Sequence, residues 1–477
     1  MIFLSFSIEF NKCFGQRNYN KNHIFYDLIF RNKNRSLGYN NRHMTPPADS
    51  ISPSKLVTAL RGFNLLPAIV FLPTRRRCDE AASEVAADKS QRTDPERQKH
   101  RQEIFDEFAA EYPEIAAHKH AKLIVRSGAA AHHAGHIPSW KLLIEKMMSG
   151  GLLNALFATS TVAAGVDFPA RTVVITNADT RGNDGWRALT ASELQQMTGR
   201  AGRRGRDNVG FVVLAPGQFQ NPKKIAELLK ASPDPLESRF RATYTSLLNL
   251  LDAFGNLEQV REIAEKSFAF RESRRAIADN RHQDGVEMLS DRIWEPFERR
   301  TAVLDHFGYI DLASETVTEN GKWLADLRID RPLLVGEALK QGIFDNLTIA
   351  HAAGLMASVA SDADRSYGEM RASRAMTDIL AGFEDIVVKV SNVEWKNGVE
   401  PAEEINYSAA AAAERWTAGM EWDELVDRTH AEEGDLVRLL SRTGEALRQL
   451  ANLSKSNPVA AAIASSASDA ILREPVR

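Results

Sequence analysis

Cysteine is nearly absent from this chain of 477 residues. Cys13 and Cys78 are the only two, and they lie far apart in the sequence. Two isolated thiols provide neither a disulfide framework nor a zinc site built from thiolates. We therefore expect a protein of a reducing compartment and place it in the cytoplasm.

Long apolar runs and a strong net charge are also lacking. No segment approaches the roughly 18 to 20 consecutive apolar residues that cross a bilayer, and the opening MIFLSFSIEF has neither the basic start nor the cleavage site of a signal peptide. The formal net charge is −3, so the overall charge does not indicate a membrane or nucleic-acid partner. Any basic surface must be local, as between Arg171 and Arg206, and we expect no membrane partner.

Alanine is missing from residues 1–43, which are rich in Asn and Phe, whereas Ala, Arg and Glu become frequent after Met44. We find no clear helical or alternating pattern in this stretch. We interpret residues 1–50 as a non-native extension, with the native chain starting near Met44, and a disordered arm is the alternative.

Short apolar runs and amphipathic segments alternate from Leu66 onward. The runs are PAIVFL, LLNALFAT, RTVVIT and VGFVVLAP, and the helical segments between them include RRRCDEAASEVAADK and PSWKLLIEKMM. Unbroken apolar runs of strand length that alternate with helices are typical of a parallel sheet covered on both faces. The pattern predicts one α/β domain with a parallel sheet over residues 51–230.

The strand pattern ends near Pro235. Long helical patterns follow, such as LESRFRATYTSLLNLLDAF and GDLVRLLSRTGEALRQLANL, so we expect a mostly α-helical C-terminal half. The alanine run at 409–413 fits either a helix or a linker. Residues 458–477 are small and polar enough for a flexible tail.

The stretch QMTGRAGRRGRD at 196–207 combines four arginines with three glycines. Glycine lets the backbone approach a ligand closely, and the planar arginine fork matches phosphate oxygens. The stretch resembles motif VI of superfamily-two helicases, where two arginines reach the terminal phosphates of a nucleotide. This resemblance implies catalytic roles for Gln196, Arg200 and Arg203, and nucleotide contacts from Gly199 and both arginines. A solvated basic loop or an unspecific RNA-binding patch is the alternative reading.

A second segment, FATSTVAAGVDFPARTVVI at 157–175, resembles motif V of the same helicases. The resemblance implies that Thr159 contacts the nucleic-acid backbone and that Gly165 and Asp167 lie at the nucleotide. Taken singly, Thr159 could instead cap a strand end and Asp167 could form a turn.

Upstream, IVFLPTRRRCDEAA resembles motif IV, although a strand followed by a basic helix start is common. The resemblance implies nucleic-acid contacts from Thr74 and Arg75.

Three histidines lie within the five residues HHAGH at 132–136. Zinc sites need about four ligands, or three and a water, and no cysteine pair or acidic cluster lies nearby in the sequence. We therefore expect no metal site here. The segment resembles the AHHAG box of superfamily-two helicases, which implies that His133 and Gly135 face the nucleic-acid backbone.

Together with DGWR, these motifs occur in the order found in the second RecA-like lobe of superkiller-like DExH-box helicases. The resemblance covers about residues 51–455. It implies a winged-helix-like region at 231–290 and a helical DSHCT domain at 291–457. In that domain Arg438 and Arg442 lie four apart on one helix face, where they would contact the nucleic-acid strand or form a solvated face.

The family's phosphate-binding GxxxxGK[ST] loop and DExH box do not occur in the printed sequence. ATP and Mg²⁺ are the expected cofactors, with the Mg²⁺ ligands supplied by a first RecA-like lobe that would have to act in trans. Our hypothesis is that this chain is the C-terminal part of an ATP-dependent helicase that acts on single-stranded RNA or DNA. A catalytically inactive nucleic-acid-binding remnant or adaptor is the alternative. An RNA-binding protein that uses only the Arg-Gly loop is a third possibility.

Overall fold

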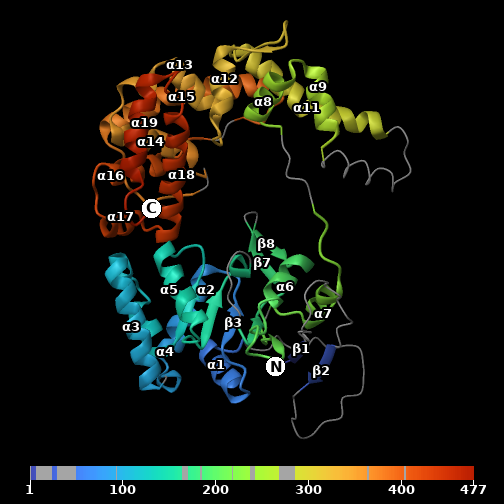
Figure 1. The fold of residues 1–477 in the computed structure, drawn as a ribbon, viewed down its shortest axis with the longest axis vertical. Coiled ribbons are helices and arrows are strands. Elements are labelled where there is room, and N and C mark those ends of the chain that lie inside the picture. The colour runs from blue at the N-terminus through green and yellow to red at the C-terminus, as the bar shows by residue number, and fades with distance from the viewer. Residues whose placement is uncertain are drawn as a thin grey trace. The chain divides into compact units, whose positions relative to one another are not determined.

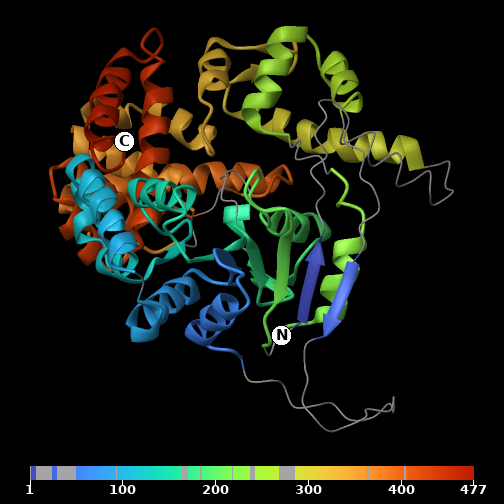
Figure 2. The same cartoon turned by 60° about the horizontal axis from the view of Figure 1, so that its bottom comes forward.

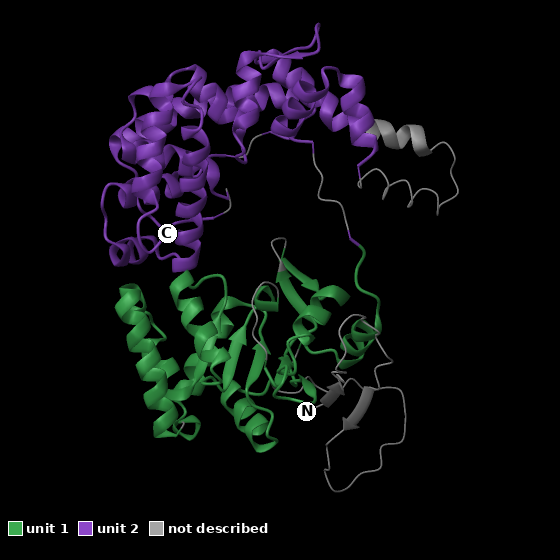
Figure 3. Ribbon diagram, viewed as in Figure 1, with its two compact units in different colours: residues 1–235 green, residues 236–477 purple. Residues whose placement is uncertain are grey.

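A computed structural model of the chain describes residues 2–6, 24–28, 50–92, 94–163, 170–182, 185–217, 219–236, 242–267, 285–362, 365–401 and 404–477. It divides into two compact units, residues 1–235 and 236–477 (Figure 3). Among the described residues, none of the helices combines the length and the apolar character needed to cross a membrane.

The first unit is built on one sheet with the strand order β2-β1-β9-β6-β3-β5-β4 (Figure 1). Five of the strands are parallel to one another: β3 (Ala68–Phe71), β4 (Ala129–His132), β5 (Ala155–Ala158), β6 (Thr172–Ile175) and β9 (Gly210–Leu214). The expected α/β domain with a parallel sheet is confirmed. The structure adds β4, which the sequence analysis did not predict because its four residues are Ala-Ala-Ala-His, and alanine is depleted in strands.

Two strands extend the sheet beyond β9, in antiparallel pairing: β1 (Ile2–Phe6) and β2 (Ile24–Leu28) (Figure 2). For these ten residues the alternative of a disordered arm is wrong, and the interpretation as a non-native extension stays a prediction. Without β1, β9 would be an edge strand with unpaired backbone groups, and IFLSF has the apolar and aromatic residues that favour strands. The rest of residues 1–49 lies outside the described part.

Helices cover the sheet. The side chains of α1 and α2 pack on one face with alternate residues of the strands, including Val70, Phe157 and Val213. The helices of this unit are α1 (Pro53–Gly62), α2 (Arg75–Ala87), α3 (Pro95–Glu111), α4 (Ala121–Ser127), α5 (Pro138–Ser149), α6 (Ala191–Thr198) and α7 (Pro222–Lys230), with short turns η1 (Lys89–Gln91), η2 (Pro113–Ala117) and η3 (Ser160–Ala163). A hairpin of β7 (Asp179–Gly182) and β8 (Gly185–Ala188) stands apart from the sheet.

The second unit is mostly helical, as expected. Its helices are α8 (Tyr244–Phe254), α9 (Leu257–Glu265), α11 (Gly285–His306), α12 (Glu319–Asp326), α13 (Pro332–Lys340), α14 (Ile349–Ala360), α15 (Arg374–Lys396), α16 (Tyr407–Thr417), α17 (Trp422–Thr429), α18 (Glu433–Ala451) and α19 (Pro458–Ile471), with a short turn η4 (Ile343–Asn346). The expectation that the strands end at Pro235 is wrong at one place, where β10 (Ile310–Asp311) and β11 (Thr316–Val317) form a small antiparallel ladder.

Two open points in this unit are settled by packing. The alanine run at 409–413 is helical, and all five side chains are buried in α16. The expectation of a flexible tail at 458–477 is wrong, because α19 packs along α18. Its buried residues are mostly alanines, and small side chains let two helices approach closely, so this segment needs no large apolar residues to be ordered.

Candidate nucleotide and nucleic-acid interface

The Arg-Gly loop begins where α6 ends. Thr190 and Glu193 form a capping box at the start of this helix, and its end is capped at Gly199. Gln196 lies on the exposed side of α6, and Gly199 is exposed as well. The helix therefore presents Gln196 to solvent and directs the chain into the loop.

Backbone hydrogen bonds join the loop to the segment that follows motif V. The N–H of Gly202 donates to the carbonyl of Ala170 at 2.7 Å, and the N–H of Ala170 donates to the carbonyl of Arg200 at 3.1 Å. Gly202 has φ +90°, and a Cβ at Gly210 would lie 2.6 Å from the carbonyl of Ala201. These glycines therefore let the loop pack against β9, in addition to any role toward a ligand.

Arg200 is half-buried and turns back onto motif V. Its Nε and Nη2 donate to the carbonyl oxygen of Ala163, at 3.1 and 2.6 Å. Ala163 is the last residue of η3, within the segment that resembles motif V. The structure therefore brings the predicted motifs V and VI together at Arg200.

Arg203 forms an internal ion pair. Its Nε and Nη2 donate to the two carboxylate oxygens of Asp207, at 2.7 and 3.0 Å, and its backbone N–H also donates to this carboxylate at 3.1 Å. Arg171 donates to the same carboxylate at 3.0 Å. The hydrogen bond from Arg203 lowers the pKa of Asp207, and the carboxylate raises the pKa of Arg203. A phosphate that binds Arg203 must compete with Asp207.

The predicted nucleic-acid contacts of motifs IV and V lie at one edge of the sheet. Thr74 caps α2 just after β3, where its hydroxyl accepts the N–H of Arg77 at 3.3 Å, and Arg75 begins that helix. Thr159 follows the neighbouring strand β5, and its hydroxyl lies 2.8 Å from that of Thr161. Ligands of open α/β sheets bind at the carboxyl ends of the strands, which is where these residues lie.

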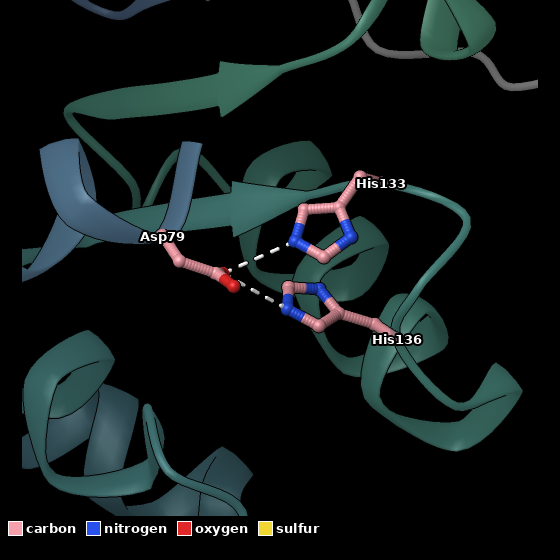
Figure 4. A group of neighbouring side chains, drawn as sticks. All are labelled: Asp79, His133 and His136. Carbon is pink, nitrogen blue, oxygen red and sulfur yellow. Dashed lines mark hydrogen bonds and ion pairs between the residues drawn. The ribbon is translucent and has the colours of Figure 1, made fainter. Parts of the chain in front are cut away.

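His133 and Gly135 are not placed as predicted. Both are buried, and the residue of this loop that faces solvent is Ala134. The ring of His133 is directed inward to Asp79 (Figure 4). We therefore correct the expectation that these two residues contact nucleic acid. The sequence did not show which way the loop turns, because the carboxylate partner of His133 lies 54 residues away.

Arg438 and Arg442 lie in the second unit, on α18, and both are near Asp362. Arg442 donates to Asp362 at 2.9 Å and also pairs with Asp330. Arg438 is 3.9 Å from Asp362, and its side chain remains 56% exposed. Arg438 is thus the more accessible of the two. Gly165 and Asp167 lie outside the described residues.

Sequence reasoning missed two residues near the motifs. Asp207 ends the quoted motif and was not given a role, although an acidic residue four positions after Arg203 indicates a possible ion pair. Trp186 in β8 is 59% exposed, and its ring stacks with that of Phe219 at a centroid distance of 6.4 Å. A large exposed aromatic side chain beside arginines is a feature of surfaces on which bases stack.

A five-stranded parallel sheet with helices on its faces fits a RecA-like α/β domain. Residues 314–477 match the DSHCT (NUC185) domain family, later at both ends than the 291–457 expected from the sequence.

Several curated relatives are similar to this chain. The chain is 37% identical over 227 residues to the chloroplastic DExH-box ATP-dependent RNA helicase DExH15 of Arabidopsis thaliana, covering 44% of this chain and 19% of that protein. It is 36% identical over 229 residues to the human exosome RNA helicase MTR4, covering 47% of this chain and 21% of that protein. It is 31% identical over 244 residues to the antiviral helicase SKI2 of Saccharomyces cerevisiae, covering 50% of this chain and 18% of that protein. The chain is therefore similar, over about half of its length, to superkiller-like DExH-box helicases, and the match spans about one fifth of each of these relatives.

Proposed function

We propose that this chain supplies the second RecA-like lobe and the C-terminal helical domain of an ATP-dependent RNA helicase. The observation that carries the proposal is the Arg-Gly loop, which is hydrogen-bonded to the motif V segment through Ala170 and Ala163. The names of the relatives MTR4 and DExH15 specify RNA, and we extend that substrate to this chain. Its location in the cytoplasm remains part of the proposal.

In this proposal Arg200 and Arg203 act as arginine fingers, with Gln196 and Gly199 beside them. Each guanidinium now binds an internal oxygen, from Ala163 or Asp207. The terminal phosphates of ATP would replace these partners, because a phosphate offers charged oxygens in the same fork geometry.

Residues of a further lobe would have to enclose the nucleotide, because the hollow in this unit is too small to hold it. The hollow at the carboxyl edge of the sheet, lined by Phe71, Pro73, Ser160 and Asn177 among others, has a volume of about 20 Å³. Ligand pockets have volumes of about 300 to 1,000 Å³. A first RecA-like lobe would supply the phosphate loop and the Mg²⁺ ligands, while Gly165 and Asp167 would reach the nucleotide from this side.

RNA would lie along the carboxyl ends of β3 and β5, where Thr74, Arg75 and Thr159 hold the sugar-phosphate backbone. Contacts of this kind fix the position of the strand without reading its bases. Trp186 provides an exposed ring on which a base can stack, and Arg438 of the second unit is a further candidate contact.

A nucleic-acid-binding adaptor without catalysis is the second candidate. It is favoured by one observation, which is that the printed sequence contains no GxxxxGK[ST] loop. ATP turnover in the presence of a first lobe distinguishes the two functions.

The decisive experiment is an ATPase assay with single-stranded RNA, on the purified chain and on the chain mixed with a first RecA-like lobe from a relative. We expect no turnover by the chain alone and RNA-stimulated turnover by the mixture. Arg203→Ala should lower that turnover by about 10³-fold or more, and RNA binding should be retained.

The matched control is Arg204→Ala, because Arg204 is the exposed neighbour of Arg203 in the same loop. Equal turnover by the Arg203→Ala protein and the wild type would remove the finger assignment. A mixture that binds RNA but never hydrolyses ATP would favour the adaptor.

A further inference from the structure

Histidine side chains gather around Asp79, on α2, in the first unit. One carboxylate oxygen, Oδ1, lies 3.0 Å from Nε2 of His120, 3.1 Å from Nε2 of His133 and 3.2 Å from Nε2 of His136. The two closest contacts from the HHAGH segment are drawn in Figure 4. All three imidazole side chains are nearly inaccessible, with exposed fractions of 4%, 0% and 2%.

Hydrogen bonds do not satisfy all the polar atoms of this cluster. A carboxylate oxygen offers two lone pairs, yet three ring nitrogens crowd around Oδ1. Nδ1 of His120 and Nδ1 of His136 are buried and have no hydrogen-bond partner among the described residues. Buried polar atoms of this kind are rare and require an explanation.

The chemical types of these groups match a metal site. Imidazole nitrogens beside a carboxylate oxygen form a donor set that transition-metal ions such as zinc accept.

Contrary to the expectation from the sequence that HHAGH forms no metal site, we propose that Asp79, His133 and His136 bind a divalent transition-metal ion, with zinc as the best match. His120 is the candidate fourth ligand. One ligand atom from each of the first three residues lies within 4.8 Å of the others. Tetrahedral zinc with bonds of about 2.0 to 2.2 Å places its ligand atoms about 3.3 to 3.6 Å apart. Oδ1 of Asp79 lies 3.0 to 3.2 Å from the three ring nitrogens, so a small outward movement of the carboxylate would admit the ion.

Metal binding has two local consequences. Each ligating Nε2 must give up its proton to Nδ1, and Nδ1 of His133 now accepts the N–H of Gly135 at 3.1 Å, so that hydrogen bond must open. Lys119 pairs with the other oxygen of Asp79 at 2.7 Å and is 57% exposed, so it can leave toward solvent and open an access route.

The ion would act as a cross-link. It would join α2 to the loop after β4 and to His120 at the start of α4, three segments that are distant in the sequence. This site is separate from the proposed nucleotide site and does not depend on the helicase assignment.

The test is titration of the metal-free full-length chain with Co²⁺, whose visible absorption reports tetrahedral coordination by nitrogen and oxygen. We expect saturation at one equivalent. His136→Gln and Asp79→Asn should each weaken binding at least tenfold, because each removes a ligand. His100→Ala is the matched control, since His100 is exposed on α3, and it should leave binding unchanged.

Stoichiometric binding that both ligand variants retain would overturn the proposal, as would the absence of stoichiometric binding by the wild type. Circular dichroism checks that the variants fold. If they do not, X-ray absorption of the zinc-loaded wild type decides, because the proposal requires imidazole scattering from at least two rings. A spectrum without imidazole would equally overturn it.

Discussion

At the residue scale, Asp207 organises the basic loop. Its side chain is 1% exposed and binds Arg203 through both oxygens, together with Arg171. A permanently charged guanidinium is costly to leave half-buried without a counter-ion. Asp207 therefore holds Arg203 in a defined position in the absence of nucleotide.

We predict that Asp207→Asn lowers the free energy of unfolding by about 1 to 3 kcal/mol at pH 7, because a buried charged acceptor is lost. The pKa of Asp207 is lowered in the folded state, so its contribution is present above the ordinary value of 3.8 and is lost as the pH falls through the folded pKa. The difference between wild type and variant should therefore be constant from pH 7 to about pH 5 and shrink below about pH 4.

Urea titrations from pH 7 to pH 3 measure this difference. Asp106→Asn is the control, because Asp106 is exposed on α3, and it should have little effect. A gap between wild type and Asp207→Asn that stays unchanged down to pH 3 would contradict the prediction.

At the element scale, the register of the Arg-Gly loop depends on how closely its backbone approaches β9. Gly210 begins that strand, and a Cβ there would lie 2.6 Å from both the carbonyl carbon and the oxygen of Ala201. Backbone atoms cannot move aside as the end of a flexible side chain can. The approach therefore requires glycine.

Gly210→Ala should lower the free energy of unfolding by about 1 to 3 kcal/mol, which is the usual cost of overpacking. Thermal unfolding measures the effect. Gly62→Ala is the matched control, because a Cβ at Gly62 meets no atom within 4 Å, and it should be neutral or stabilising by up to about 1 kcal/mol. Equal melting temperatures for the Gly210→Ala protein and the wild type would refute this account.

Whether a strand or helix could be predicted from the sequence depended on its amino-acid composition. The strands β3, β6 and β9 contain Ile, Val or Phe in unbroken runs, and such runs predict buried strands. The alanine strand β4 and the alanine-rich helix α19 were not predicted as such, because alanine carries little information about strand or packing. Their assignments depend on neighbours that are distant in the sequence.

At the scale of the whole molecule, each of the two units has a core of its own. The first is centred on the sheet and on α1 and α2. In the second, Leu440 of α18 is fully buried in the helical unit. Separate cores allow a local defect to destabilise one unit without the other.

We predict that Leu440→Ala destabilises the second unit by about 2 to 5 kcal/mol, because it leaves a cavity in a buried site. Hydrogen exchange measured by mass spectrometry should show faster exchange in peptides from 242–477 and unchanged exchange in peptides from 50–235. Leu312→Ala is the control, since Leu312 is 38% exposed. Faster exchange throughout both units would show that they unfold together.

The sequence by itself determined the class of fold, the order of the helicase motifs and the division near residue 235, because apolar periodicity and short motifs are local properties of the chain. Only the tertiary structure decided where the side chains of those motifs point. It turned His133 inward to Asp79 and paired Arg203 with Asp207. Such pairings depend on the direction of the chain and on which charges meet at a sheet edge, and a linear pattern does not contain that information.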